Sequence, residues 1–357
     1  MKLPPLISVP LSWLYGMVVH IRHKLFDLKI LRSEEFDIPV VCIGNLTVGG
    51  TGKTPVAELL IERFSEHYRV GVLSRGYRRK TKGFVLSTPT SSARTIGDEP
   101  RQMKLKYPSV PVAVCEKRAE GIRLLRKAHP EIELIILDDA FQHRYVEPWV
   151  NILLMDYNNP VYRDRLLPWG RLRGTRNQIH RANFVLVTKC PDDLNPLDMR
   201  IVINSLGLFP YQSLYFTRMR QGEITPLFAD RAVGKVREGD PVIAMSGIAN
   251  PVPLLENLRK RFDVVAELTF DDHHTYRLSD MRRLEALFAA YPDAVVLTTE
   301  KDAVKLTNRK KVPEAVQQRL YYVPIHVSFV ADSESEFLRQ LELYVRTNQK
   351  YSLLHPE

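Results

Sequence analysis

GNLTVGGTGKT, residues 44–54, is the stretch of sequence that decides the fold. It follows the apolar run 38–43, which predicts a short buried strand, and it precedes residues 55–68, whose pattern predicts a helix. Glycines between a strand and a helix let backbone N–H groups turn inward around phosphate oxygens, and the start of the helix adds partial positive charge. The stretch therefore predicts a phosphate-binding P-loop.

Residue types within this loop indicate the role of each side chain. The residues expected to bind a nucleoside triphosphate are Gly49, Gly50, Thr51, Gly52, Lys53 and Thr54. Lys53 is expected to reach the β- and γ-phosphates, and the Thr54 hydroxyl is expected to bind Mg²⁺. One position departs from the usual GxxxxGK[ST] pattern, because Thr47 stands where the first glycine is expected. A chance glycine-rich turn is the alternative, and the strand before it and the helix after it argue against that alternative.

Two carboxylates follow another apolar run. Residues 134–137 (LIIL) predict a buried strand, and Asp138 and Asp139 come directly after it. Because the carboxyl ends of parallel strands meet at one edge of a sheet, these side chains are expected beside the phosphate loop. Mg²⁺ prefers oxygen ligands, so we expect at least one of the two carboxylates to bind it, directly or through water. Solvated carboxylates at a strand end are the alternative.

Apolar runs alternate with helical patterns along most of the chain. Strands are expected at 38–43, 70–73, 110–114, 134–137, 152–155 and 184–187, and again at 242–246, 264–268, 294–298 and 320–324. This alternation is typical of an α/β fold, here a P-loop NTPase-like parallel sheet flanked by helices, with a second, smaller α/β domain. We expect residues 36–213 to form the P-loop domain, 214–238 a linker and 239–357 the smaller C-terminal domain.

Residues 1–35 form a separate N-terminal segment. An almost wholly apolar run at 3–19 is followed by a basic stretch. Prolines at positions 4, 5 and 10 interrupt the run, so an unbroken helix of the roughly 20 residues that span a bilayer is not expected. No small-residue cleavage site marks a signal peptide. A helix over 12–31 with apolar and cationic side chains suits a membrane interface, and a helix packed on the protein core is the alternative.

The charge of the chain restricts its partners. The 357 residues carry a formal net charge of +10, and the sequence pI is about 9.4. A basic balance of this size suits anionic partners such as acidic lipid headgroups or phosphorylated substrates. No aromatic RNA-reading signature or zinc-finger spacing is visible, so a nucleic-acid partner is not expected, and no obligate protein partner is evident. Cys42, Cys115 and Cys190 form no CxxC pair and are expected to be buried free thiols.

Six further motifs accompany the P-loop. They are LSRGYRR (73–79), GDEP (97–100), LDDAFQHR (137–144), LLPWGRLR (166–173), FDDHHTY (270–276) and TEKDAVKL (299–306). Together with VGGTGKTP (48–55), they resemble the tetraacyldisaccharide 4′-kinases, the lipid A 4′-kinases of Gram-negative envelope synthesis. The motifs run in order from about Gly44 to Leu306, and the N-terminal segment is similar to that of the family as well.

The resemblance implies an ATP-dependent kinase that needs Mg²⁺. The enzyme would transfer the γ-phosphoryl group to the 4′-hydroxyl of a tetraacylated glucosamine disaccharide 1-phosphate, a lipid-linked disaccharide of lipid A biosynthesis. It would be a peripheral protein on the cytoplasmic face of the inner membrane, so the inner-membrane surface would be a further partner. The fold implied is two α/β/α units joined by a short two-stranded linker.

Phosphoryl transfer needs a group that accepts the proton of the attacking hydroxyl. By resemblance, Asp98 of GDEP is that base and pairs with a histidine of the DHH segment, His273 or His274, with a slight preference for His274. The alternative for Asp98 is the N-cap of the helix that begins just after it. Asp139 is a candidate for contact with the acceptor, and His143 is a weaker candidate for acid–base work.

Four arginines are candidates for binding substrate phosphate, because guanidinium groups match phosphate oxygens in pairs. They are Arg75 and Arg78 after the second strand, and Arg171 and Arg173 in the basic loop 165–176. This loop also carries leucines and Trp169, a mixture that suits a lipid phosphate at an interface. A solvated basic loop is the alternative. The cluster 298–302 (TTEKD) matches a family motif, and a structural role is expected for it.

Two other functions are alternatives on the sequence. A membrane-associated P-loop ATPase switch of the partitioning type has a similar glycine-rich loop and a membrane helix, but its loop carries lysine where this chain has Val48. Such a switch would hydrolyse ATP without a lipid acceptor, whereas the kinase is expected to be nearly idle. The second alternative is a non-enzymatic nucleotide-binding scaffold, and the intact set of Lys53, Thr54, Asp138 and Asp139 argues against it.

Overall fold

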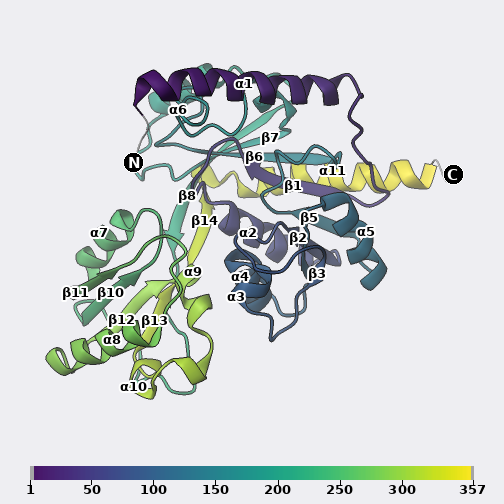
Figure 1. Cartoon of the computed structure of the whole chain (residues 1–357). Helices are drawn as coiled ribbons and strands as arrows, with labels where there is room; N and C mark the ends of the chain where they lie inside the picture. Colours follow the sequence, from purple (N-terminus) through teal and green to yellow (C-terminus); the bar gives the residue numbers. More distant parts are fainter. Residues whose placement is uncertain (1–3, 355–357) are drawn as a thin grey trace.

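The computed structural model of the chain describes residues 4–354, so positions 1–3 and 355–357 of the predicted terminal segments lie outside the described residues. The larger part is built on a nine-stranded sheet with the order β14-β8-β7-β6-β1-β5-β2-β4-β3 (Figure 1). Its strands are β1 (Val40–Asn45), β2 (Val70–Ser74), β3 (Val85–Leu86), β4 (Val112–Val114), β5 (Leu134–Leu137), β6 (Val150–Asp156), β7 (Phe184–Thr188), β8 (Ser213–Gln221) and β14 (Ile325–Phe329).

The inner strands of this sheet run parallel to their neighbours, and only β14 and β3 at the two edges run antiparallel. The strands β1, β5, β6 and β7 are buried at every position. Helices cover both faces, which explains why these strands are continuous apolar runs without polar alternation. The predicted α/β class is confirmed, and β5 has the predicted bounds.

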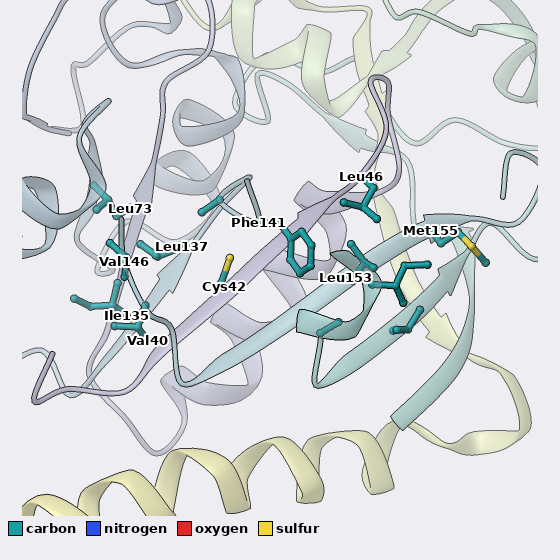
Figure 2. Close-up of a cluster of buried hydrophobic side chains, with 14 of the residues drawn as sticks. Val40, Cys42, Leu46, Leu73, Ile135, Leu137, Phe141, Val146, Leu153 and Met155 are labelled. Atoms are coloured by element: carbon teal, nitrogen blue, oxygen red, sulfur yellow. The ribbon is translucent and has the colours of Figure 1, made fainter. Parts of the chain in front are cut away.

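One face of the sheet is covered by α5 (Arg118–Ala128), α6 (Pro196–Leu206) and the 3-10 helix η1 (Arg176–Arg181). Figure 2 shows the centre of this core, where the ring of Phe141 lies over β1 between Cys42 and Leu46 and beside Leu153. A side chain at Gly44 would place its Cβ 2.6 Å from the Cβ of Phe141, so only glycine allows this close approach. The start of the phosphate loop is therefore fixed by packing.

The opposite face is covered by α2 (Lys53–Ser65), α4 (Asp98–Lys106) and α11 (Glu334–Leu354), with the short helix α3 (Ala93–Ile96) before α4. The helix α11 buries Phe337, Leu341 and Val345, which share one face of a helix at their four-residue spacing. In Figure 1 the helices α2 and α11 lie on one side of the sheet, and α1 and α6 lie on the other. The larger unit thus has three layers.

The smaller unit is built on a five-stranded sheet with the order β11-β10-β12-β13-β9, in which only β9 runs antiparallel to its neighbour. Its strands are β9 (Thr225–Pro226), β10 (Pro241–Ser246), β11 (Asp263–Thr269), β12 (Val295–Thr299) and β13 (Leu320–Val323). Its helices include α7 (Val252–Arg261), α8 (Leu278–Ala290), α9 (Glu300–Ala303) and α10 (Glu314–Gln317). Separate apolar clusters fill the two faces of the sheet, so this unit has its own core.

Two strands carry the chain from the larger unit to the smaller one and back. The start of β8 pairs with β7, and its end, from Thr217 to Gln221, pairs with β14 (Figure 1). After β14 the chain has returned to the larger unit, because α11 packs on the large sheet. The structure differs here from the expected boundary, which assigned all of residues 239–357 to the smaller domain. Pairing between strands so far apart in sequence leaves no local signal in either strand.

The helix α1 (Pro5–Asp27) is continuous over 23 residues, so the expected start at Ser12 is wrong. Pro4 is the N-cap and Pro5 lies in the first turn, where a missing N–H leaves no broken hydrogen bond. Pro10 lies inside the helix, and the carbonyl left without a donor belongs to Leu6, which is exposed to water. Among residues 4–354, no helix is long and apolar enough to cross a membrane.

The helix α1 turns polar side chains toward the protein. Ser8, Ser12 and His23 are buried, and Phe26 is its one buried large apolar residue. The exposed apolar residues are Leu6, Ile7, Leu11, Trp13, Leu14, Met17, Val18 and Ile21. The alternative of a helix that buries its apolar side in the protein core is therefore wrong. An apolar surface of this kind usually marks a contact with another molecule or with a membrane.

Candidate active site

The phosphate loop connects β1 to α2 at the carboxyl edge of the large sheet. Gly49 and Gly52 have φ angles of 114° and 82°, a region that favours glycine, and Gly52 is the N-cap of α2. The helix begins at Lys53, so Lys53 and Thr54 stand on its first turn. The strand, loop and helix that the motif requires are therefore all present.

The basic loop 165–176 is bonded to the phosphate loop along its backbone. The N–H of Val48 donates to the carbonyl of Arg171 at 2.8 Å, and the N–H of Arg173 donates to the carbonyl of Leu46 at 2.7 Å. Leu172, between the two arginines, is buried in the core of the larger unit. A displacement of this basic loop would therefore also displace the phosphate loop.

The helix α1 contacts the same basic loop. The Ser12 hydroxyl donates to the carbonyl of Leu166 at 2.9 Å, and the Tyr15 hydroxyl donates to the carbonyl of Arg173 at 2.8 Å. A Cβ added at Gly16 would lie 2.8 Å from the side chain of Leu166, so the helix and the loop are in close contact. The exposed apolar helix is therefore separated from the phosphate loop by the thickness of a single loop.

The carboxylates of Asp138 and Asp139 directly follow β5, as expected from the sequence. Asp139 Oδ1 lies 3.7 Å from the ammonium of Lys53 and accepts a hydrogen bond from Arg173 Nη2 at 3.0 Å. Asp138 is wholly buried, and its Oδ2 accepts a hydrogen bond from the Ser74 hydroxyl at 3.0 Å. Its other oxygen, Oδ1, has no hydrogen-bond partner among the described residues.

These adjacent carboxylates differ in their affinity for protons. Burial, together with the charges of Glu99 and Asp139, raises the pKa of Asp138 to about 7. Burial also acts on Asp139, but the cations Lys53 and Arg173 outweigh it and lower the pKa of this carboxyl. A buried carboxylate oxygen without a donor, next to an ionised carboxylate, is suited to a metal cation.

The carboxylate of Asp98 meets a histidine of the smaller unit. His273 Nδ1 lies 3.0 Å from Asp98 Oδ2, and Asp98 is the first residue of α4. His273 Nε2 faces the Lys301 ammonium at 3.4 Å, which can only donate, so we assign the ring proton to Nδ1. Burial of Asp98 opposes its ionisation, but the His273 hydrogen bond and the Lys305 charge outweigh burial and lower its pKa. Asp98 is therefore ionised near neutral pH.

The slight preference for His274 as the partner of Asp98 is wrong. His274 Nε2 lies 3.0 Å from Asp280 Oδ2, within the smaller unit. The N-cap interpretation of Asp98 is also wrong, because the N-cap of α4 is Gly97, with φ 94°. Asp98 stands one position later, so its side chain is available to His273.

His143 has surroundings that disfavour acid–base work. Its Nε2 accepts a hydrogen bond from the backbone N–H of Arg118 at 3.3 Å. Burial, with the positive charge of Arg118 and other arginines, lowers the pKa of His143 to about 4. The imidazole is therefore neutral near pH 7, and a group with so low a pKa is a weak base there.

The two predicted arginines of the basic loop have different surroundings. Arg173 bonds Asp139 and also the side-chain oxygen of Asn45. Arg171 points to solvent, where its Nε lies 3.3 Å from Asp164 Oδ2. Both arginines flank the buried Leu172, but their side chains have different partners. Of the two, only Arg173 contacts the acidic pair.

The arginines Arg75 and Arg78 both lie on the exposed side of the loop that follows β2. Arg78 Nη1 donates to the carbonyl of Asp272 in the smaller unit at 3.2 Å, next to His273. Arg78 and His273 have φ angles of 59° and 63°, which residues with a side chain rarely adopt. Such strained conformations are concentrated at functional sites, and here they flank the Asp98–His273 pair.

Comparison with known proteins covers almost the whole chain. The family model described as tetraacyldisaccharide-1-P 4′-kinase matches residues 5–344. The chain belongs to this family. The tetraacyldisaccharide 4′-kinase of Phocaeicola vulgatus is 45% identical over 350 residues, which is 96% of each chain. That of Bacteroides thetaiotaomicron is 44% identical over 356 residues, covering 96% of this chain and 94% of the relative.

A solved structure is similar over the same length. The crystal structure of "apo" form LpxK from Aquifex aeolicus in complex with ATP matches with a TM-score of 0.73 and 27% sequence identity. The match covers 94% of this chain and 98% of that chain. The resemblance of the motifs to the tetraacyldisaccharide 4′-kinases is thereby confirmed, and so is the P-loop NTPase-like fold.

Two lysines lie at the site of this kinase family member and were not predicted from the sequence. They lie in the motif 299–306, and a structural role was expected for the cluster 298–302, which includes Lys301. Asp302 does have that role, because its Oδ2 accepts hydrogen bonds from the Gly247 N–H and the Thr299 hydroxyl at 2.9 and 2.7 Å. Lys301 and Lys305, in contrast, face His273 and Asp98. Their i, i+4 spacing on a helical segment was the available signal.

Three polar residues of the larger unit were also missed. Ser74 bonds Asp138, and Asn45 Nδ2 donates to the Thr51 hydroxyl at 2.9 Å inside the phosphate loop. Glu99 follows Asp98 on α4, and its charge acts on Asp138. Each lies within one of the quoted stretches, but its contact could not be inferred from the sequence.

Proposed function

We propose that this chain transfers the γ-phosphoryl group of ATP to the 4′-hydroxyl of a tetraacylated glucosamine disaccharide 1-phosphate. The observation that carries the proposal is the Asp98–His273 pair, in which an ionised carboxylate of the P-loop unit meets a histidine of the smaller unit. Membership of the tetraacyldisaccharide-1-P 4′-kinase family supports the choice of acceptor. ATP as the donor is supported by the similar structure that holds ATP.

In the proposed reaction, Asp98 is the general base. The 4′-oxygen attacks the γ-phosphorus opposite the bond to ADP, the new P–O bond forms, and the bond to the ADP oxygen breaks. The hydroxyl proton passes to Asp98 Oδ1 or Oδ2. His273 donates to Asp98 and so orients the carboxylate, while Lys301 holds the far side of the ring. A positioned base of this kind contributes roughly 10²–10⁴-fold to the rate.

The triphosphate would be held by the backbone of residues 49–54 and by Lys53. The helix start at Lys53 adds partial positive charge at the same place. Lys53 is already paired with Asp139, so a bound phosphate would compete with a carboxylate for its ammonium. Arg75 and Arg78, exposed on the loop after β2, are proposed to bind substrate phosphate, as is Arg171.

The residues of the site fit Mg²⁺. Asp138 Oδ1 is a buried oxygen without a donor, Asp139 is ionised, and the Thr54 hydroxyl stands on the first turn of α2. Mg²⁺ is commonly bound through one or two carboxylates together with substrate phosphates. Thr54, Asp138 and Asp139 would hold the ion, which when bound would neutralise charge on the phosphates.

We also propose that α1 lies in the interface of the inner membrane, on its cytoplasmic face. Its exposed leucines, isoleucines and Trp13, together with the net charge of +10, support this position. Trp169 of the basic loop is also exposed. Because α1 is bonded to that loop, a lipid acceptor held at the interface would be close to the phosphate loop.

The test is a transfer assay with γ-labelled ATP, Mg²⁺ and the purified tetraacyldisaccharide 1-phosphate in micelles. We expect label in the lipid and almost no ATP hydrolysis when the lipid is omitted. Equal ATP consumption with and without the lipid, and no labelled lipid, would instead support a membrane-associated ATPase switch. Nucleotide binding without either reaction would support a scaffold.

A further inference from the structure

One lysine, outside the candidate active site described above, forms ion pairs with two glutamates, one from each unit. Lys106 is the last residue of α4, and its Nζ lies 2.7 Å from Oε2 of Glu58 on α2. The same Nζ lies 3.3 Å from Oε1 of Glu300, the first residue of α9. The helices α2 and α4 belong to the larger unit and α9 belongs to the smaller one. A single ammonium group therefore bridges the two units.

Glu58 is built into this bridge. Its side chain is only 3% exposed, which is rare for a carboxylate unless it is paired. Its Oε1 accepts a hydrogen bond from Gln102 Nε2 at 2.8 Å, and its backbone carbonyl accepts one from the Tyr107 hydroxyl at 3.2 Å. Gln102 and Lys106 lie on α4, and Tyr107 follows directly. The P-loop helix α2 is thus bonded to α4 through this one residue.

The helix α4 contacts the smaller unit at both of its ends. At its start, Asp98 bonds His273 at 3.0 Å and lies 3.8 Å from Lys305. At its end, Lys106 bonds Glu300. Eight residues of helix separate the two contacts by about 12 Å. Two contacts at this separation restrict the relative orientation of the two units more than either contact alone would.

We propose that Glu58, Lys106 and Glu300 form an interdomain clamp that positions Asp98 and His273 against the phosphate loop. None of the three touches the reacting groups, so each is a positioning residue. The proposal rests on the proposed function, because it assigns Asp98 the role of base. It adds residues that none of the seven motifs singled out as functional: Glu58 and Lys106 lie outside them, and Glu300 lies in one for which only structure was expected.

The chemistry of the clamp favours a geometric role over a stabilising one. A buried ion pair gains little net stability, because the loss of hydration offsets the attraction between the charges. What the charges provide is direction, since an ammonium with two carboxylates accepts few arrangements. Loss of one partner would both loosen the second contact and leave a buried charge without a counterion.

The test uses the full-length enzyme and three substitutions on the clamp. Lys106→Met removes the charge and keeps the length of the side chain, and Lys106→Arg keeps the charge. Glu300→Gln removes the negative charge that the smaller unit contributes and leaves the Glu58–Lys106 pair in place. The matched control is Lys104→Met on the same helix, because among the described residues Lys104 Nζ bonds the carbonyls of Pro108 and Val110 and no carboxylate.

We expect Lys106→Met and Glu300→Gln to lower kcat by roughly 10²-fold, as a displacement of about 1 Å would do. The Kd of a non-hydrolysable ATP analogue is expected to stay unchanged, because the phosphate loop keeps its own contacts. In a plot of kcat against pH, the acid limb of both variants is expected to move to higher pH. The reason is that Asp98 loses the His273 and Lys305 contacts that lower its pKa. Lys106→Arg is expected to recover much of the activity, and Lys104→Met to match the wild type.

A wild-type kcat and an unmoved pH profile in Glu300→Gln would overturn the clamp, as would equal losses in Lys104→Met. If Lys106→Met does not fold, Glu300→Gln alone decides the question, because it leaves the interior of the larger unit unchanged. If the proposed kinase function itself is wrong, the wild-type enzyme will transfer no label to the lipid, and this result is distinct from those that would overturn the clamp.

Discussion

His273 Nδ1 lies 3.0 Å from the carboxylate of Asp98, although 175 positions separate the two residues in the sequence. Asp98 belongs to the unit that carries the phosphate loop, and His273 belongs to the smaller unit. The proposed base is therefore complete only when the two units are in contact. In the proposed mechanism, the smaller unit supplies the histidine that orients the base.

Substitution of the two adjacent histidines separates their roles. We expect His273→Ala to lower kcat by at least tenfold with little change in nucleotide affinity, because Asp98 loses the group that orients it. His274→Ala is the matched control, since His274 bonds Asp280 within the smaller unit. Steady-state kinetics with the lipid acceptor measure both. Equal losses in the two variants would contradict the pairing seen in the structure.

Substitution of Asp98 tests the base itself. Asp98→Ala is expected to lower kcat by roughly 10²-fold or more while the ATP analogue still binds, because the phosphate loop is unaffected. Asp98→Asn keeps the shape and the His273 contact, so it should be as inactive as the alanine variant. Calorimetric titration with the analogue gives the binding control. Turnover close to that of the wild type in either variant would remove Asp98 from the mechanism.

The main features of the fold could be predicted because buried parallel strands are apolar at most positions. The strand before the acidic pair was predicted at its observed bounds, 134–137. The return of the chain through β14 was not predictable, because Ile325–Phe329 pairs with residues that precede it by about 100 positions, and no local pattern records that pairing. The first two turns of α1 were missed because prolines were read as breaks, although Pro5 lies where proline is tolerated.

The site was predictable residue by residue only where one motif contained all the geometry. The phosphate loop is such a case, since one strand, one loop and one helix define it. The choice between His273 and His274 was not, because neighbouring residues point in different directions and the positive φ of His273 decides which one faces Asp98. Arg171 and Arg173 flank the buried Leu172, and no local pattern shows that only Arg173 reaches Asp139.

Removal of the P-loop lysine tests the phosphate loop. Lys53→Ala is expected to reduce kcat/KM by at least roughly 10²-fold, because a cation aimed at the transferring phosphoryl group is lost. Glu62→Ala, on an exposed position of the same helix, is the control for effects on α2. The transfer assay with labelled ATP measures both variants. Near-normal activity of Lys53→Ala would mean that the triphosphate binds elsewhere.

The exposed apolar face of α1 predicts membrane binding. Trp13 and Val18 are 77% and 57% exposed, so Trp13→Glu and Val18→Glu should leave the fold unchanged. Each side chain contributes about 1.5–3 kcal/mol when fully buried, so we expect each substitution to weaken vesicle binding about tenfold or more. Leu343→Glu, exposed on α11 at the opposite side of the sheet, is the control. Undiminished sedimentation with acidic phospholipid vesicles would place α1 outside the interface.

The clamp predicts that Glu58 contributes to the pH dependence of stability. Burial and the charge of Glu300 raise the pKa of Glu58 from 4.5 to about 7, against the opposing effect of Lys106. The other titratable groups that face it are Tyr107 and Tyr322, whose pKa values burial raises, so both stay neutral between pH 5 and 9. Around neutral pH the bridge therefore gains or loses one proton, and that proton resides on Glu58.

A raised folded-state pKa fixes the sign of the effect. The folded protein binds this proton more tightly than the unfolded chain, so the contribution to stability is complete below pH 4.5 and is lost as the pH rises through about 7. The difference in pKa sets an upper limit of about 3 kcal/mol. Glu58→Gln resembles the protonated state, so the difference in Tm between it and the wild type should grow between pH 6 and pH 8. Glu62→Gln, exposed on the same helix, is the control and should leave the pH dependence of Tm unchanged. A difference in Tm between Glu58→Gln and the wild type that stays constant from pH 6 to pH 8 would show that Glu58 does not titrate in this range.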